Sequence, residues 1–298
     1  MKVLITAKNG QLGWELQQSI PDGIDVVALN SSELDITDSD VVSSVISREK
    51  PDFVINAAAY TAVDNAESDK DACFAVNYKG IKNLANACKA TSTKLIHIST
   101  DFVFNGEKNT PYKPCDESNP LGVYGESKRN GELALLEELP CSSLVIRTAW
   151  VYSAHGNNFV KTMLRLMTEK PQLGVVYDQV GTPTWAGGLA KAIWQIVSQD
   201  NQLNTGVYGK IYHWTDAGVT SWYDFAVAIQ QQALELGLLD KEIPIKAIPA
   251  SAYPTPAKRP SFSVLDKSLF EQSFGVDTIH WQQQLKIMLM QLKQYTNP

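Results

Sequence analysis

The chain has 298 residues and a mass of 32.9 kDa, with 44% hydrophobic residues and a formal net charge of −6. This length allows one large α/β domain or two smaller ones, with a sizeable core. The acidic balance argues against a nucleic-acid or anionic-membrane partner, and no apolar run reaches the roughly 20 residues of a membrane span. Four cysteines without CxxC spacing indicate reduced thiols and a cytoplasmic protein, and four scattered histidines argue against a zinc site.

The first half of the chain alternates short apolar runs with amphipathic stretches, which is typical of βαβ units. The apolar runs show little alternation, as expected where helices cover both faces of a sheet. We therefore predict an α/β fold of the Rossmann type with a doubly wound parallel sheet. The expected strands are residues 2–6, 24–29, 52–57, 94–99 and 143–150, and the expected helices are residues 11–20, 38–49, 69–91 and 124–139.

The second half is richer in Trp, Tyr and Pro, and it contains no repeat and no Gly/Ser linker. It contains an expected helix over residues 185–199, a strand over 209–214, a helix over 221–237 and a proline-rich segment over 248–263. We predict a dinucleotide-binding domain over residues 1–152, to which residues 172–200 return, and a smaller C-terminal α/β domain for the substrate over residues 153–298.

A glycine turn, TAKNGQLGWELQQ, follows the first expected strand, and Gly10 and Gly13 stand three apart at the start of a helix. Such a turn lets backbone N–H groups and the helix dipole approach a pyrophosphate. Ala7, at the same interval before Gly10, leaves the backbone less room than a glycine would. The position between strand and helix favours a dinucleotide site over a plain tight turn. Its expected residues are Gly10, Gln11, Leu12 and Gly13.

The end of the second expected strand bears on the choice of nicotinamide cofactor. An Asp there would accept hydrogen bonds from the ribose of NAD, but this sequence has the neutral Asn30, followed by Ser31, and Lys8 lies in the glycine turn. These residues favour NADPH and leave NADH open, or they simply form a polar loop. Further cofactor contacts are expected from Asp35 and Ile36 at the adenine edge and from the small residues Ala57, Ala58 and Ala59.

Thr100 and Asp101 end the fourth expected strand, at the sheet edge where open α/β proteins bind ligands. Tyr124 and Lys128 are four residues apart and share one helix face. A phenol with a pKa of about 10 is a poor acid–base group at neutral pH, and an ammonium group one turn away is expected to lower that pKa. With Thr100 holding a carbonyl oxygen, these groups can protonate an alkoxide while a nicotinamide delivers hydride. The plainer alternative for a Tyr–Lys pair is a solvated helix edge.

Several motifs in order resemble the extended short-chain dehydrogenase/reductases and, within them, the dTDP-4-dehydrorhamnose reductases. They are the glycine turn, NAAAYTAVDNAE, STDFVFNG, VYGESK, RTAWVYSAHGNNFVKTML, DQVGTPT and PTPAKRPSFSVLD, which together run nearly end to end. The resemblance implies NADPH- or NADH-dependent reduction of the 4-keto group of dTDP-4-dehydro-L-rhamnose to dTDP-L-rhamnose, the last step of dTDP-rhamnose synthesis. It implies catalytic roles for Thr100, Tyr124 and Lys128.

The same resemblance implies substrate contacts. A planar guanidinium such as that of Arg259 pairs bidentately with phosphate oxygens and would suit a diphosphate. The plainer alternatives are core packing for Trp150 and a surface charge for Arg259. The implied substrate residues are Asp101, Trp150, Asn157, Asn158, Phe159 and Arg259.

Some members of this family dimerise around a metal held by glutamates. Here Glu15 matches one such position, but the others hold Gly187 and Gln291. Because a hard cation would lack carboxylate ligands, we expect no metal and no metal-bridged dimer, and leave a homodimer open.

The alternatives to a reductase are other functions found on the same fold. A 4,6-dehydratase would carry a glutamate directly after the TD pair, where this chain has Phe102, which cannot move a proton. A 4-epimerase would hold NAD tightly and recycle it. A non-catalytic regulatory subunit of the same fold is a further alternative, against which Thr100, Tyr124 and Lys128 argue. The residues alone do not separate a dTDP from a UDP carrier, and they do not give the oligomeric state.

Overall fold

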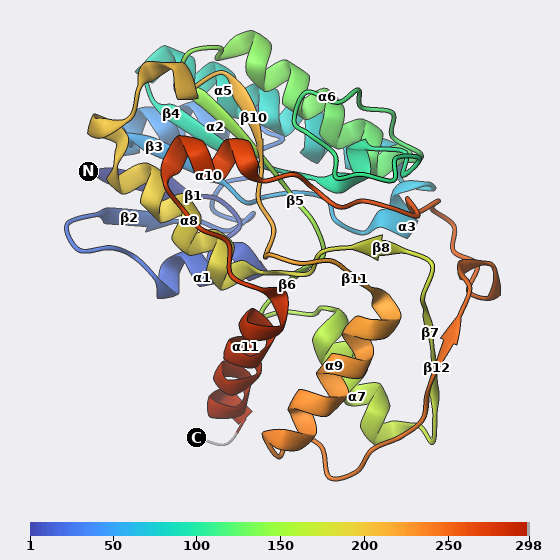
Figure 1. The fold of residues 1–298 in the computed structure, drawn as a ribbon. Helices are drawn as coiled ribbons and strands as arrows, with labels where there is room; N and C mark the ends of the chain where they lie inside the picture. Colours follow the sequence, from blue (N-terminus) through green and yellow to red (C-terminus); the bar gives the residue numbers. More distant parts are fainter. Residues whose placement is uncertain (297–298) are drawn as a thin grey trace.

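The computed structural model describes residues 1–296 and has a six-stranded sheet at its centre. The strand order is β10-β5-β4-β3-β1-β2, and every neighbouring pair is parallel (Figure 1). The predicted parallel α/β fold is therefore confirmed. The strand order reverses between β1 and β3, which is where such sheets leave a crevice at their carboxyl ends. The strands are β1 (Lys2–Ile5), β2 (Asp25–Ala28), β3 (Phe53–Asn56), β4 (Lys94–Thr100), β5 (Ser143–Thr148) and β10 (Lys210–His213).

Helices cover both faces of the sheet, and this explains the uninterrupted apolar strands. Val3 and Ile5 of β1 pack on one face, while Leu4, between them, packs on the other. Figure 1 shows the two layers on opposite sides of the strands. One layer holds α1 (Gln11–Gln18), α8 (Ala186–Ser198) and α10 (Ser268–Phe274), and the other holds α2 (Ser39–Glu49), α5 (Gly80–Thr91) and α6 (Val123–Glu138).

A second core, with Tyr152, Phe225, Trp281 and Leu285 among its residues, joins three helices beyond the sheet. In Figure 1 these helices gather below the sheet, beside the long β7–β12 ribbon. The helices are α7 (Phe159–Glu169), α9 (Trp222–Glu235) and α11 (Trp281–Thr296), and the strand pairs are β7 (Leu173–Val176) with β12 (Ile245–Ile248), β6 (Val151–Tyr152) with β9 (Thr184–Trp185), and β8 (Val180–Gly181) with β11 (Thr220–Ser221).

The division of the chain at residue 152 stays a prediction. Any boundary has to allow for α8, β10 and α10, which come from the second half of the chain and lie against the central sheet. None of the helices described within residues 1–296 is long and apolar enough to cross a bilayer.

The helix expected over residues 69–91 is not regular. It comprises α4 (Lys70–Phe74), a π-helical turn (Ala75–Lys79) and α5. The buried Asn77 lies in the π turn, where its side chain accepts a hydrogen bond from the backbone N–H of Tyr60 at 2.9 Å and donates to the Ser127 hydroxyl at 3.0 Å. A π turn of this kind often marks a functional region. The predicted helix is thus confirmed over residues 70–91, but the π turn inside it was not predicted, because apolar spacing contains no information on this contact.

The remaining elements are short. They are α3 (Val63–Ala66) and the 3₁₀ turns at Asp101–Val103, Asp200–Gln202, Thr205–Val207 and Ala250–Ala252. The strand expected over residues 143–150 ends at Thr148 because Trp150 takes a left-handed backbone conformation, with φ of 47°. The sequence analysis did not predict α7, α10 or α11.

A buried ion pair fastens α6 to the sheet. Glu132 accepts hydrogen bonds from Nε and Nη2 of Arg147 in β5, at 2.8 and 2.7 Å, and from the hydroxyl of Ser99 in β4 at 2.6 Å. The side chains of Arg147 and Glu132 are 1% and 0% exposed. Such a pair is costly to break, because the remaining charge stays buried.

We expect Arg147→Met to lower the free energy of unfolding by about 3–5 kcal/mol, since Glu132 then loses its main counter-charge. Chemical denaturation measures this loss. The matched control is Arg165→Met, which removes an exposed pair with Glu169 and should cost less than about 1 kcal/mol. Equal losses in the two variants would show that the buried pair does not fasten α6.

Candidate active site

A cavity of about 590 Å³ lies at the carboxyl ends of the central strands, where the strand order reverses. Such crevices are the usual ligand sites of α/β proteins. The turn after β1, the loop after β3, the end of β4, the start of α6 and the segment after β5 line it. The structure brings together here eleven of the predicted residues: Gly10, Gln11, Leu12, Ala57, Ala59, Thr100, Asp101, Tyr124, Lys128, Trp150 and Asn157.

The glycine turn has the geometry of a pyrophosphate site. A Cβ at Gly13 would come within 2.2 Å of the Ala7 carbonyl oxygen, so only glycine fits there. No side chain caps the N-terminus of α1, and the first residues of the helix, Gln11 and Leu12, line the cavity. The backbone N–H groups of this first turn have no partner within the helix and suit a bound anion. Ala7 has a φ of 54°, a conformation that glycine adopts more readily. This is the strain that the alanine introduces into the turn.

The loop after β2 is internally bonded. The Asn30 side-chain oxygen accepts from the backbone N–H and the hydroxyl of Ser32, at 3.0 and 2.7 Å. Glu33 pairs with Lys8 at 2.7 Å. A cofactor phosphate would therefore compete with Glu33 for Lys8. Among the predicted cofactor residues, Gly13, Asn30, Ser31, Asp35, Ile36 and Ala58 are not lining residues of the cavity, and their cofactor contacts stay predictions.

Tyr124 lines the cavity together with Thr100 and Phe102. Its ring meets that of Phe102 edge-on, with centroids 5.6 Å apart. Burial raises the pKa of Tyr124, and a side-chain hydrogen bond with Thr100 acts in the opposite direction. The expected lowering of this pKa is therefore wrong for this structure. The phenol keeps its proton at neutral pH, which is the form that can protonate an alkoxide.

Lys128 is buried against β4. Its Nζ donates to the Ile98 carbonyl oxygen at 2.6 Å and lies 3.3 Å from Nε2 of His97. Burial lowers the pKa of Lys128 to about 8, although the charges of Glu132 and Cys73 act to raise it. The ammonium form is therefore still favoured over the amine at neutral pH, but by much less than in an ordinary lysine.

Asp101 is 2% exposed, and burial raises the pKa of its carboxyl group to about 6, against hydrogen bonds from Ser263 and Thr100. A carboxyl group in this condition changes its charge close to physiological pH. It lies next to Thr100, whose hydroxyl donates to Asp101 Oδ1 at 3.1 Å.

Trp150 and Trp222 form the wall of the cavity towards the second core. Their rings stack with centroids 3.5 Å apart and planes 10° apart. Trp222, the first residue of α9, also lines a second, mainly apolar cavity of about 370 Å³ with Phe159, Tyr253 and Arg259. The sequence analysis missed Trp222, because nothing in SWYDF distinguishes a site residue from a core aromatic.

Two predicted substrate residues have protein partners. Asn158 is the N-cap of α7: its side chain accepts from the N–H of Lys161 at 3.1 Å and donates to Gln11 in the glycine turn at 3.0 Å. The guanidinium of Arg259 pairs bidentately with Asp64, at 3.1 and 2.8 Å. Arg259 is thus a paired group at the edge of the second cavity, and its fork is already held in one orientation.

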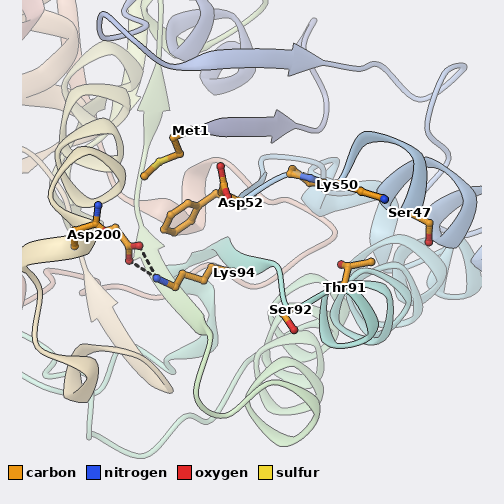
Figure 2. Close-up of a pocket in the computed structure, with 11 residues that line it drawn as sticks. Met1, Ser47, Lys50, Asp52, Thr91, Ser92, Lys94 and Asp200 are labelled. Carbon is orange, nitrogen blue, oxygen red and sulfur yellow. Dashed lines mark hydrogen bonds and ion pairs between the residues drawn. The ribbon is translucent and has the colours of Figure 1, made fainter.

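A further hollow of about 600 Å³ lies at the opposite, amino-terminal edge of the sheet. Figure 2 shows it between Met1, Asp52, Lys50 and the ion pair of Lys94 with Asp200. None of the predicted site residues lines this hollow, so the cavity at the carboxyl ends is the candidate active site.

Glu15, Gly187 and Gln291 stand at the positions where some members of the family hold a metal. Glu15 is buried and accepts a hydrogen bond from the Ser153 hydroxyl at 2.6 Å. A Cβ at Gly187 would meet the Trp185 ring at 2.3 Å. Within the part of the chain that the structure describes, no three His, Cys, Asp or Glu side chains are placed to hold a metal ion.

Known proteins resemble this chain over almost its whole length. The family profile described as RmlD substrate binding domain matches residues 1–294. A dTDP-4-dehydrorhamnose reductase from Aggregatibacter actinomycetemcomitans is 45% identical over 287 residues, which cover 96% of this chain and 97% of that protein.

Solved structures of reductases with the same name are also similar to this chain over almost its whole length. The crystal structure of a dTDP-4-dehydrorhamnose reductase from Clostridium acetobutylicum is 39% identical, with a TM-score of 0.90, over 98% of this chain and 100% of that one. A reductase of the same name from Bacillus anthracis, in complex with NADP, is 32% identical, with a TM-score of 0.90, over 97% of this chain and 99% of that one. The resemblance inferred from the sequence motifs is confirmed, and the chain belongs to the dTDP-4-dehydrorhamnose reductase family.

Proposed function

We propose that this chain reduces the 4-keto group of dTDP-4-dehydro-L-rhamnose to dTDP-L-rhamnose, with NADPH as the preferred and NADH as the second cofactor. The observation that carries the proposal is the single cavity lined by the glycine turn together with Thr100, Tyr124 and Lys128. Relatives of this chain carry the name of that activity, and one of them was solved with NADP. The four cysteines are unpaired, which supports a cytoplasmic location.

The residues of the chain act on the oxygen of the keto group. Bound nicotinamide would supply the hydride. The Thr100 hydroxyl would turn from Asp101 to donate its one hydrogen to the carbonyl oxygen, and the protonated phenol of Tyr124 gives its proton to the alkoxide as charge develops there. Lys128, when it carries a proton, stabilises the phenolate that Tyr124 becomes. Asp101 and Trp150 then border the sugar.

The diphosphate of the substrate would lie between the two cavities, within reach of Arg259. The apolar cavity beside it, with Phe159 and Trp222, suits the flat face of a base or the apolar face of a sugar. Lining by aromatic rings does not separate a dTDP from a UDP carrier, so carrier specificity needs a direct comparison.

The function is tested by supplying the keto sugar from the upstream enzymes of the pathway and following nicotinamide absorbance, separately with NADPH and NADH. We expect oxidation of NADPH that depends on the keto sugar and yields dTDP-L-rhamnose in equal amount. Absence of oxidation with both cofactors, from protein that binds them, would contradict the proposal. Bound NAD without net consumption would instead indicate a 4-epimerase.

Tyr124→Phe should lower kcat about 10²–10⁴-fold, because the proton donor is lost. The Kd of NADPH should stay within a few-fold, since the ring remains in place. Steady-state kinetics and fluorescence titration of NADPH measure the two quantities. Tyr177→Phe removes a hydroxyl from an exposed ring outside the active-site cavity and should keep wild-type turnover. Near-normal kcat for Tyr124→Phe would mean that another group is the acid.

Arg259→Gln should raise the KM for the nucleotide sugar about 10- to 100-fold, as expected for the loss of charged hydrogen bonds to phosphate, with kcat changed much less. Asp64→Asn is the matched variant, because it removes the ion pair but leaves the guanidinium. It should leave KM equal or lower. If Asp64→Asn raises KM as much as Arg259→Gln, the arginine acts through its pair with Asp64 and not through the substrate.

A further inference from the structure

Four buried polar side chains form a row of hydrogen-bonding neighbours beneath the candidate active site, from the residue after β1 through β3 and β4 to α6. Its members are Thr6, Asn56, His97 and Lys128, and each is at most 1% exposed. The catalytic prediction for this site used only the last of them. The direction of each hydrogen bond in the row can be worked out from the side chains themselves.

Thr6 sets the direction at one end. Its hydroxyl oxygen accepts from the backbone N–H groups of Ala57 and Ala58, both at 3.1 Å. With both lone pairs occupied, the hydroxyl hydrogen is donated to Oδ1 of Asn56, at 2.7 Å. The N–H of Ala58 also reaches Asn56 Oδ1, at 3.2 Å. The oxygen of Asn56 therefore faces Thr6, and its amide nitrogen faces the other way.

His97 accepts a hydrogen bond from the amide nitrogen of Asn56. Asn56 Nδ2 lies 3.0 Å from Nδ1 of His97. The amide nitrogen can only donate, so Nδ1 carries a lone pair and no proton. Burial and the nearby Lys128 lower the pKa of His97 well below its usual value, so the ring is neutral. The single ring proton is then on Nε2.

The Nε2–H bond points at Lys128, whose Nζ is 3.3 Å away. An amine nitrogen has a lone pair that accepts this hydrogen, whereas an ammonium group offers only N–H donors and would repel it. The hydrogens of the amine are still free to bind the Ile98 carbonyl oxygen, at 2.6 Å.

The other groups around Lys128 do not cancel the effect of the His97 Nε2–H bond, which disfavours the ammonium form. On its own helix these are the protonated phenol of Tyr124 and Glu132, and Glu132 is already paired with Arg147. From α4 comes Cys73, and burial raises the pKa of its thiol. No unpaired anion among these groups holds a proton on the lysine.

We propose that Asn56 and His97 are positioning residues that fix the imidazole as its Nε2–H tautomer and thereby destabilise the ammonium form of Lys128 relative to the amine, so that the charge of Lys128 responds to a negative charge in the cavity. A negative charge there favours the ammonium form, whose proton comes from the bulk solvent, and the ammonium group stabilises a phenolate at Tyr124. This role rests on the proposed reductase function, whereas the tautomer and the charge of Lys128 are properties of the protein alone. They are measured without turnover.

The first test is the tautomer of His97 in the wild-type protein, read from long-range ¹H–¹⁵N correlations of its imidazole at pH 7. The His97→Phe variant identifies the signal. We expect a protonated Nε2 and an unprotonated Nδ1. A protonated Nδ1, in either the neutral or the charged ring, overturns the proposal, even if the protein proves to be an active reductase.

The second test changes the tautomer. Asn56→Asp replaces the amide donor by a carboxylate that accepts from Nδ1–H, so Nε2 becomes an acceptor for the ammonium form of Lys128. We expect the midpoint of the Lys128 titration, followed by its ¹³Cε shift, to rise by roughly one pH unit or more. In the His97→Phe background the same substitution should shift it much less. Equal shifts in both backgrounds would mean that the added charge acts directly, without the ring, and would overturn the proposal.

Discussion

The candidate active site depends on how α6 is positioned against β4. Three residues at successive turns of α6 contact the end of β4: Tyr124 bonds with Thr100, Lys128 with the carbonyl of Ile98, and Glu132 with the hydroxyl of Ser99. Because residues four apart lie above one another on a helix, one rotational setting of α6 satisfies all three contacts. The buried Arg147 locks that setting from β5.

Close approach of the helix to the strand is part of the same constraint. A Cβ at Gly125 would come within 2.2 Å of the Phe102 carbonyl oxygen. A larger residue at this position would therefore push the first turn of α6 away from the sheet. The Tyr124 hydroxyl would move with it, out of reach of Thr100. The glycine between Tyr124 and Lys128 is thus as much a requirement of this geometry as the two side chains themselves.

Local patterns predicted the features that depend on local sequence. The strand patterns predicted all six strands of the central sheet. The glycine turn predicted a tight turn between the first strand and a helix, and the spacing of Tyr124 and Lys128 predicted their common helix face. The pairing of Arg259 with Asp64, the stacking of Trp222 on Trp150 and the contact of His97 with Lys128 could not be predicted. Each joins residues that are distant in the sequence, and no local pattern links the two partners. The direction of the Tyr124 pKa shift was mispredicted for a related reason, since desolvation depends on what the whole fold places around the ring.

The carboxylate of Asp64 already occupies both arms of the Arg259 guanidinium. An anion that takes the same two nitrogens must displace a partner that belongs to the protein, so the exchange of one oxyanion for another yields little net attraction. A small free phosphate, with nothing else to contribute, would gain little by this exchange. A ligand whose remaining groups also fill the aromatic cavity next to the arginine would gain more, so the ion pair would favour long, composite ligands over simple anions.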